Sequence, residues 1–163
     1  MATLANNTGN HSIDINITVV PDNVTWNGVA GTNWDLTSVN WAVVGTGDFV
    51  AFRQGDGVTF DDTLTNDFVG GAQPTNVNLT ANFSVYPIPG LTVNSSLPYT
   101  FSGPGGLTGP APLISSGGGS LSLLTSNSYT GGTTVSGGGT LIITNDSALG
   151  ASSGGILLHG APL

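Results

Sequence analysis

A short glycine-rich string occurs twice in this chain and constrains its fold more than any other feature. Ser116–Leu121 has the sequence SGGGSL and Ser136–Leu141 has the sequence SGGGTL, so the two copies begin 20 residues apart. Short runs of Val, Ile, Leu and Thr lie between these glycine turns. A fixed period of this length is typical of repeat folds in which each repeat forms one coil and buries its apolar face only against its neighbours. The repeat therefore predicts a short β-solenoid.

The composition supports an all-β chain with a folded core. No lysine, glutamate or cysteine occurs among the 163 residues, whereas Ser, Thr, Asn, Gly and Val are abundant. These residues favour strands and turns over helices. So low a charged fraction can also mark a disordered chain, but hydrophobic residues make up 38% of this one, which is enough to form a core. We therefore expect a folded all-β protein of one domain, with or without an extension.

The distribution of charge excludes several kinds of partner. The formal net charge is -8, and no charged residue occurs from Phe68 to Asn145. An acidic chain without a basic patch is unsuited to nucleic acid. No apolar run reaches the roughly eighteen residues of a membrane-spanning helix, and Met1–Thr3 lacks the basic and apolar regions of a signal peptide. The sequence thus predicts no nucleic-acid partner, no membrane insertion of this segment and, without cysteine, no disulfide framework.

The chain divides into three predicted regions. Residues 1–20 contain a flexible, patternless lead at Met1–Ser12 and then Ile13–Val19, in which apolar and polar residues alternate as in a strand. Residues 21–90 contain the tryptophans and most of the acidic residues, in short β elements that form a cap. Residues 91–163 contain the solenoid coils and end in an unfinished one. The strands expected in these coils are Ser120–Leu124, Thr133–Val135 and Thr140–Ile143, and Ser153–Leu158 begins one more turn.

The repeats also resemble a known family. The motifs are YTGGTTV at Tyr129–Val135, GGTL at Gly138–Leu141 and ALG at Ala148–Gly150. Residues 127–150 closely resemble the autotransporter-associated β-strand repeat of bacterial passenger regions, and Gly117–Leu123 resembles it more loosely. The tryptophan series from Trp26 to Phe60 resembles the segment that often precedes these repeats. The resemblance implies a right-handed parallel β-helix, an extracellular or bacterial cell-surface location, a role in building or transporting a surface structure, and no catalytic residues.

The acidic residues are the candidates for catalysis. Parallel β-helices also host polysaccharide lyases, which need a cationic base, and Arg53 is the single lysine or arginine here. Hydrolases need two carboxylates at a defined separation. The candidates are Asp48, Asp56, Asp61 and Asp62. Because aspartates beside Gly or Thr usually accept backbone hydrogen bonds in turns, we predict no catalytic residues and a protein that is not an enzyme.

The same aspartates are the candidates for a metal site. Asp56, Asp61 and Asp62 would gather around Ca²⁺ if their loops converged, but their spacing fits neither an EF-hand nor the glycine-rich nonapeptide repeat. His11 and His159 have no partner for a metal site or a catalytic triad nearby in the sequence. We therefore favour solvated turns and predict no metal and no cofactor.

The three tryptophans allow two interpretations. Trp26, Trp34 and Trp41 recur at intervals of eight and seven residues. If exposed, their rings would stack on sugars. Large aromatic side chains in a small domain are usually buried, so we favour a hydrophobic plug that closes the first coil.

The sequence thus predicts a non-enzymatic structural protein, a β-solenoid building block of a cell-surface stalk or of a self-assembling fibre. In the fibre, copies associate head to tail through open coil edges. The strand at Ile13–Val19 either pairs within its own sheet or adds to a neighbouring molecule. The alternative functions are a passenger fragment of an autotransporter adhesin and a surface module that binds glycans.

Overall fold

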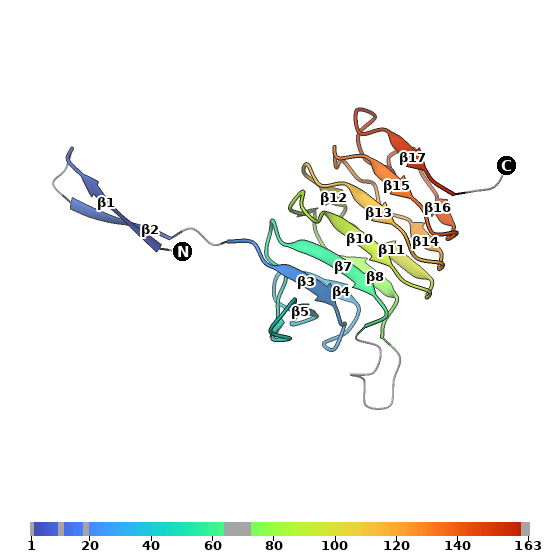
Figure 1. Ribbon diagram of the computed structural model, residues 1–163, viewed down its shortest axis with the longest axis horizontal. Coiled ribbons are helices and arrows are strands. Elements are labelled where there is room, and N and C mark those ends of the chain that lie inside the picture. The colour runs from blue at the N-terminus through green and yellow to red at the C-terminus, as the bar shows by residue number, and fades with distance from the viewer. Residues whose placement is uncertain (1, 10–11, 18–19, 64–72, 161–163) are drawn as a thin grey trace.

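The computed structural model describes residues 2–9, 12–17, 20–63 and 73–160 (Figure 1). Every regular element in these ranges is a β-strand, which confirms the all-β prediction. Most strand pairs are parallel, and the strands form two larger and two smaller sheets. No helix long and apolar enough to cross a membrane occurs in the described part of the chain.

The two larger sheets contain most of the chain. The order in the eight-stranded sheet is β17 (Ile156–Leu158), β15 (Thr133–Val135), β13 (Leu113–Ser115), β10 (Leu91–Asn94), β7 (Gly57–Asp61), β3 (Asn23–Trp26), β5 (Trp41–Val43) and β6 (Phe49–Val50). The order in the five-stranded sheet is β16 (Leu141–Ile143), β14 (Leu121–Leu123), β11 (Tyr99–Ser102), β8 (Asn76–Leu79) and β4 (Asn33–Trp34). From β7 onward the chain passes back and forth between these sheets, so the strands stack as in Figure 1.

The 20-residue repeat brings equivalent strands side by side. Leu121 in β14 pairs in parallel with Leu141 in β16, 20 residues further on, and the glycine turns before these strands also meet. Gly137 has a φ of +77°, and a Cβ at this position would lie 1.8 Å from the carbonyl oxygen of Ser116. Only glycine permits both this conformation and so close an approach of two backbones. The repeated glycines therefore set the spacing of successive corners.

A buried asparagine joins three successive passes of the chain. Asn127 is 6% exposed, and its Oδ1 accepts hydrogen bonds from the Leu107 backbone N–H at 2.8 Å and from the Thr125 hydroxyl at 3.0 Å. Its Nδ2 donates to the carbonyl oxygen of Ala148 at 2.6 Å. Because the amide satisfies groups in the pass before and the pass after its own, it fixes their stacking without any charge.

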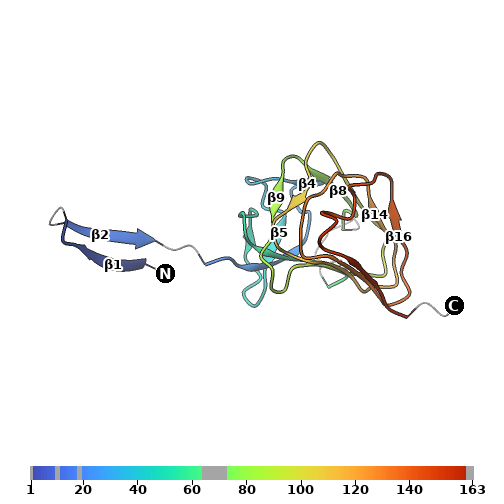
Figure 2. The same cartoon turned by 90° about the horizontal axis from the view of Figure 1, so that it is seen from above.

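The N-terminal residues differ in part from the prediction. β1 (Ala2–Asn7) pairs antiparallel with β2 (Ser12–Ile17), and Ala2 lies opposite Ile17. The prediction of a patternless lead is therefore wrong for Ala2–Asn7, whereas the strand expected from Ile13 is confirmed as far as Ile17; Val19 lies outside the described residues. In both views this hairpin lies apart from the stacked sheets (Figures 1 and 2).

Further strands lie where the sequence pattern gave no clear signal. β13 lies between β15 and β10 in the eight-stranded sheet, and β12 (Leu107–Thr108) pairs in parallel with β9 (Phe83–Ser84), where Phe83 did indicate a strand, to form a small additional sheet. The eight-stranded sheet also runs through the predicted boundary at residue 90, because β7 before it pairs in parallel with β10 after it.

Candidate functional site

One end of the stack is closed by aromatic side chains. We call the end formed by β3, β4, β5 and β6 the capped end. Trp26, Trp34 and Trp41 are all 0% exposed there, which confirms the predicted plug. Trp34 stacks on Phe83 with ring centroids 5.3 Å apart, and Trp41 meets Trp34 edge to face at 4.9 Å. Since none of the three indoles has an exposed face, the interpretation in which they stack on sugars is wrong.

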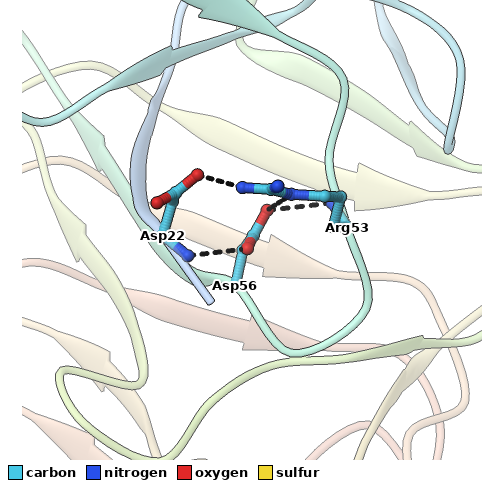
Figure 3. Close-up of polar contacts among 3 residues, drawn as sticks. All are labelled: Asp22, Arg53 and Asp56. Carbon is cyan, nitrogen blue, oxygen red and sulfur yellow. Dashed lines mark hydrogen bonds and ion pairs between the residues drawn. The ribbon is translucent and has the colours of Figure 1, made fainter. Parts of the chain in front are cut away.

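The single arginine is held in a polar cluster at the capped end (Figure 3). The Arg53 guanidinium donates to a carboxylate oxygen of Asp22, and its Nε lies 3.9 Å from a carboxylate oxygen of Asp56. Asp56 is 0% exposed and accepts the backbone N–H groups of Asp22 and Arg53, each at 2.9 Å. The cluster fastens the segment before β3 to the loop between β6 and β7. Arg53 is thus held in ion pairs within the fold, whereas the lyase interpretation required it to act as a cationic base.

The next two candidate aspartates bind turns of their own chain. Asp61 accepts the Thr63 N–H at 3.0 Å, and Asp62 accepts the N–H of Ser96 at 2.9 Å and its hydroxyl at 2.7 Å. Burial acts to raise the pKa of Asp62, but hydrogen bonds from Ser95 and Ser96 outweigh it and hold the pKa below its ordinary value. Asp61 thus stabilises its own turn, as expected of an aspartate near Thr, whereas Asp62 joins its loop to the distant segment at Ser96.

Tyr99 is a buried phenol whose ionisation is affected by these carboxylates. Burial raises the pKa of its hydroxyl, and the charges of Asp62 and Asp61 raise it further. The side chain is 0% exposed. A phenol in this environment stays protonated throughout the physiological range.

The remaining candidates do not assemble into a site. Asp48 lies exposed in the turn between β5 and β6, and His159 lies exposed directly after β17. His11 lies outside the described residues. Among the residues that are described, no three His, Cys, Asp or Glu side chains come together as metal ligands.

The opposite end of the stack exposes apolar side chains. We call the end formed by β16 and β17 the open end. Leu141–Ile143 and Ile156–Leu158 are the last strands of their sheets, and each is paired on one side (Figure 1). Ile143 is 46% exposed and Leu158 is 70% exposed. The position equivalent to Ile143 in the preceding pass is covered, since Leu123 is 0% exposed. The open end is the candidate functional site, because core positions there lack cover.

A concave hollow accompanies the open end. Its volume is about 460 Å³, and it lies between the glycine turn at Ser136–Leu141 and the segment Leu158–Gly160. His159 is the one titratable side chain in its lining. The hollow therefore offers backbone and apolar groups to an occupant, and it lacks the paired acid and base that hydrolysis requires.

No protein-family model, curated protein or solved structure matches this chain. The class that the structure defines is an all-β protein with mostly parallel sheets. The resemblance to the autotransporter-type repeat stays a prediction that rests on the motifs themselves.

Sequence reasoning missed the Asp22–Arg53–Asp56 cluster. One signal was available, because the only strong cation of an acidic chain is expected to pair with a carboxylate. The sequence could not indicate which of the nine acidic residues that would be, since Asp22 lies 31 residues from Arg53 and approaches it only when β3 pairs with β7.

Proposed function

We propose that the two larger sheets are the faces of a short β-solenoid whose coils build part of a stalk or fibre on the outside of a bacterial cell, and that the chain is not an enzyme. One observation carries the proposal: equivalent strands stack in register in both sheets and end at an edge that lacks cover. Leu113 pairs with Thr133 and Leu121 with Leu141, so at this step both sheets advance by the same 20 residues, whereas the next step in the eight-stranded sheet, from Thr133 to Ile156, is 23 residues. A coil that repeats in this way buries its apolar face against the next coil.

The charge distribution supports a structural role. Asp146 is the only charged residue after Asp67. Like charges repel when they lie opposite each other on neighbouring strands, so a neutral repeat stacks on copies of itself without this penalty. The groups considered for catalysis are used in structure, because Arg53 is paired with aspartates and Asp56 is buried beneath it.

The passenger-fragment alternative uses the same coils. In that version, further coils of a longer polypeptide cover the open end, and the segment serves as part of the rod that displays an adhesin. The glycan-binding alternative has lost the residues that suggested it, since the three tryptophans are fully buried. A glycan panel measured by tryptophan fluorescence tests what remains of it, and we expect no sugar-dependent quenching.

Immunogold electron microscopy of the source cells tests the proposal. An antibody raised against the purified chain should label a surface appendage or the outer envelope of intact cells, and deletion of the coding segment should remove both the label and that structure. Label confined to the cell interior, with an unchanged cell surface, would overturn the proposed function. Negative-stain images of the purified chain then separate the versions, because filaments support the fibre and short particles support the stalk.

A further inference from the structure

Two buried amide side chains at the capped end lack part of their hydrogen bonding. Asn27, which directly follows β3, is 1% exposed, and Gln73, which lies shortly before β8, is 2% exposed. Among the residues that the structure describes, neither Oδ1 nor Nδ2 of Asn27 has a hydrogen-bond partner, and Oε1 of Gln73 has none either. Burial of an amide without partners costs free energy, and native proteins satisfy nearly all such groups with protein atoms or internal water.

The orientation of the Gln73 amide is fixed by its one hydrogen bond. Its Nε2 donates to the carbonyl oxygen of Trp26 at 2.5 Å, and a carbonyl oxygen only accepts. Exchange of the amide nitrogen and oxygen would place two acceptors against each other. Gln73 therefore requires a donor at Oε1, and the Nδ2 group of Asn27 is a donor that lacks an acceptor.

The two amides meet at one peptide unit. Trp26 and Asn27 are consecutive, so the carbonyl that accepts from Gln73 belongs to the peptide group that leads into Asn27. The segment that contains Gln73 is held there, because Trp26 Nε1 donates to the carbonyl oxygen of Pro74 at 2.8 Å. The packing is tight, since a Cβ on Gly28 would lie 2.8 Å from Cδ of Pro74. The unsatisfied atoms of both amides are thus close together, but no direct hydrogen bond joins them.

A neighbouring asparagine has all the partners that Asn27 lacks. Asn40 is 0% exposed, and its carbonyl oxygen accepts the backbone N–H of Asn27 at 2.8 Å. Its Oδ1 accepts the N–H of Ala30 at 2.7 Å, and its Nδ2 donates to the carbonyl oxygen of Asn33 at 2.8 Å. The chain therefore satisfies one buried amide of the capped end entirely with its own atoms. The difference at Asn27 indicates a partner that is not part of the chain.

We infer that an internal water molecule binds between Asn27 and Gln73 as an integral part of the capped end. It donates a hydrogen bond to Oε1 of Gln73 and accepts one from Nδ2 of Asn27. Water fits this position because it both donates and accepts, and because the neutral amides present one amino group and two oxygens. A cation would meet the amino group, and an anion would meet the oxygens.

The water joins two segments that are distant in the sequence. It connects the end of β3, where the tryptophan plug begins, to the segment that leads into β8. Buried waters that bridge otherwise unsatisfied groups are costly to remove, so this one helps to hold the capped end closed. The inference concerns the capped end alone, and the proposed stalk or fibre plays no part in it.

A crystal structure at a resolution that shows ordered water tests the position directly. We expect a water oxygen about 2.7–3.2 Å from Oε1 of Gln73 and at a similar distance from Nδ2 of Asn27. A direct hydrogen bond between the two side chains, a dry contact, or a water bound to only one of them would overturn the inference.

Nuclear magnetic resonance tests the water in solution. In the isotope-labelled chain, the side-chain amino group of Asn27 should show a nuclear Overhauser cross-peak to long-lived water. The amino group of Asn40 is the internal control and should show none, because it is equally buried and donates to Asn33. Absence of the cross-peak at Asn27, or an equal one at Asn40, would contradict the bridge.

A substitution of Gln73 tests whether both amides hold the water. Gln73→Met keeps an unbranched side chain of similar length but removes the oxygen that accepts from the water, so the cross-peak at Asn27 should be lost. Gln54→Met is the matched control and should retain it, because Gln54 also donates to a distant carbonyl, that of Asn82, but at an exposed position. Unchanged signals from Asn40 show that each variant is folded. A cross-peak that persists in Gln73→Met, or disappears in Gln54→Met, would exclude a water held by Gln73.

Discussion

The two ends of the stacked sheets differ in how their apolar side chains are covered. At the capped end, the chain reverses direction in β5, which pairs antiparallel with β3, and tryptophans fill the space beneath. At the open end, the strands repeat without reversal, and the last side chains remain exposed. Repeat folds need terminal capping units, and the buried tryptophans belong to such a unit at the capped end. The comparison shows that the apolar side chains are covered by aromatic rings at the capped end and are partly exposed in the last described strands.

The sequence reflects this difference in its distribution of residue types. The three tryptophans and eight of the nine aspartates lie at or before Asp67, and the glycine-rich repeats follow. The capped end is therefore expected to respond strongly to single substitutions, because each side chain there has particular partners. The open end is expected to tolerate changes at its exposed positions.

The largest expected effect is the loss of an indole at the capped end. Trp34→Ala removes a ring that contacts Trp41, Phe52 and Phe83, and it should lower the free energy of unfolding by about 3–5 kcal/mol. Ile143→Ala at the open end should lower it by less than about 1 kcal/mol, because Ile143 is 46% exposed. Urea unfolding followed by circular dichroism measures both. Equal losses would remove the distinction between the ends.

The polar cluster at the capped end should show the next largest effect. Asp56→Ala leaves Arg53 and two backbone N–H groups without their buried acceptor, so we expect a loss of about 3 kcal/mol. Asp22→Ala breaks the partly exposed half of the same cluster and should lower stability by about 0.2–1 kcal/mol. The same urea titration compares the two variants, and a larger loss for Asp22→Ala would contradict the assigned roles.

The glycine turns provide a sharper test of the repeat. Gly137 and Gly138 both have positive φ angles, but a Cβ on Gly137 would meet the Ser116 carbonyl, whereas nothing lies within 4 Å of one on Gly138. Gly138→Ala should lower stability by about 1 kcal/mol through backbone strain alone. Gly137→Ala should lower it by about 2 kcal/mol or more, because the two passes must also separate. Thermal unfolding of the two variants makes the comparison, and similar melting temperatures would mean that the corners are not in tight contact.

Much of this architecture could be predicted from the sequence, and the omissions have physical causes. The period between Leu121 and Leu141 identified stacked strands because identical residues recur at a fixed spacing. β13 was missed because Leu113–Ser115 follows a proline-rich stretch and lacks the flanking motif, and its place in the sheet is set by neighbours on both sides. A local sequence pattern cannot predict this pairing, because the position of β13 depends on contacts with the neighbouring strands.

The candidate site was harder to predict than the fold. The tryptophan plug followed from the tendency of large aromatic rings to be buried. The acidic residues were predicted to lie in turns, but their particular partners could not be predicted because some are distant in the sequence, such as Ser96 for Asp62. The exposure of Leu158 depends on which strand is last in the sheet, so three-dimensional packing was needed to reveal the open end.

The smallest expected effect is the response of the molecule to acid. Asp35 and Asp62 both lie before the repeats and have lowered pKa values. Burial acts to raise the pKa of each carboxyl, but hydrogen bonds outweigh it: from Ser38 and Thr37 at Asp35, and from Ser95 and Ser96 at Asp62. Their stabilisation is therefore complete above the ordinary pKa of 3.8 and is lost as the pH falls through the lower folded-state values. The Asp62→Asn variant has no titrating group at this position. Its free energy of unfolding should therefore fall less steeply with decreasing pH than that of the unaltered chain. Ser96→Ala should act in the same direction, because it removes a hydroxyl that donates to Asp62. Urea unfolding at a series of acid pH values measures these slopes, and an unchanged slope in Asp62→Asn would assign the acid response to other groups.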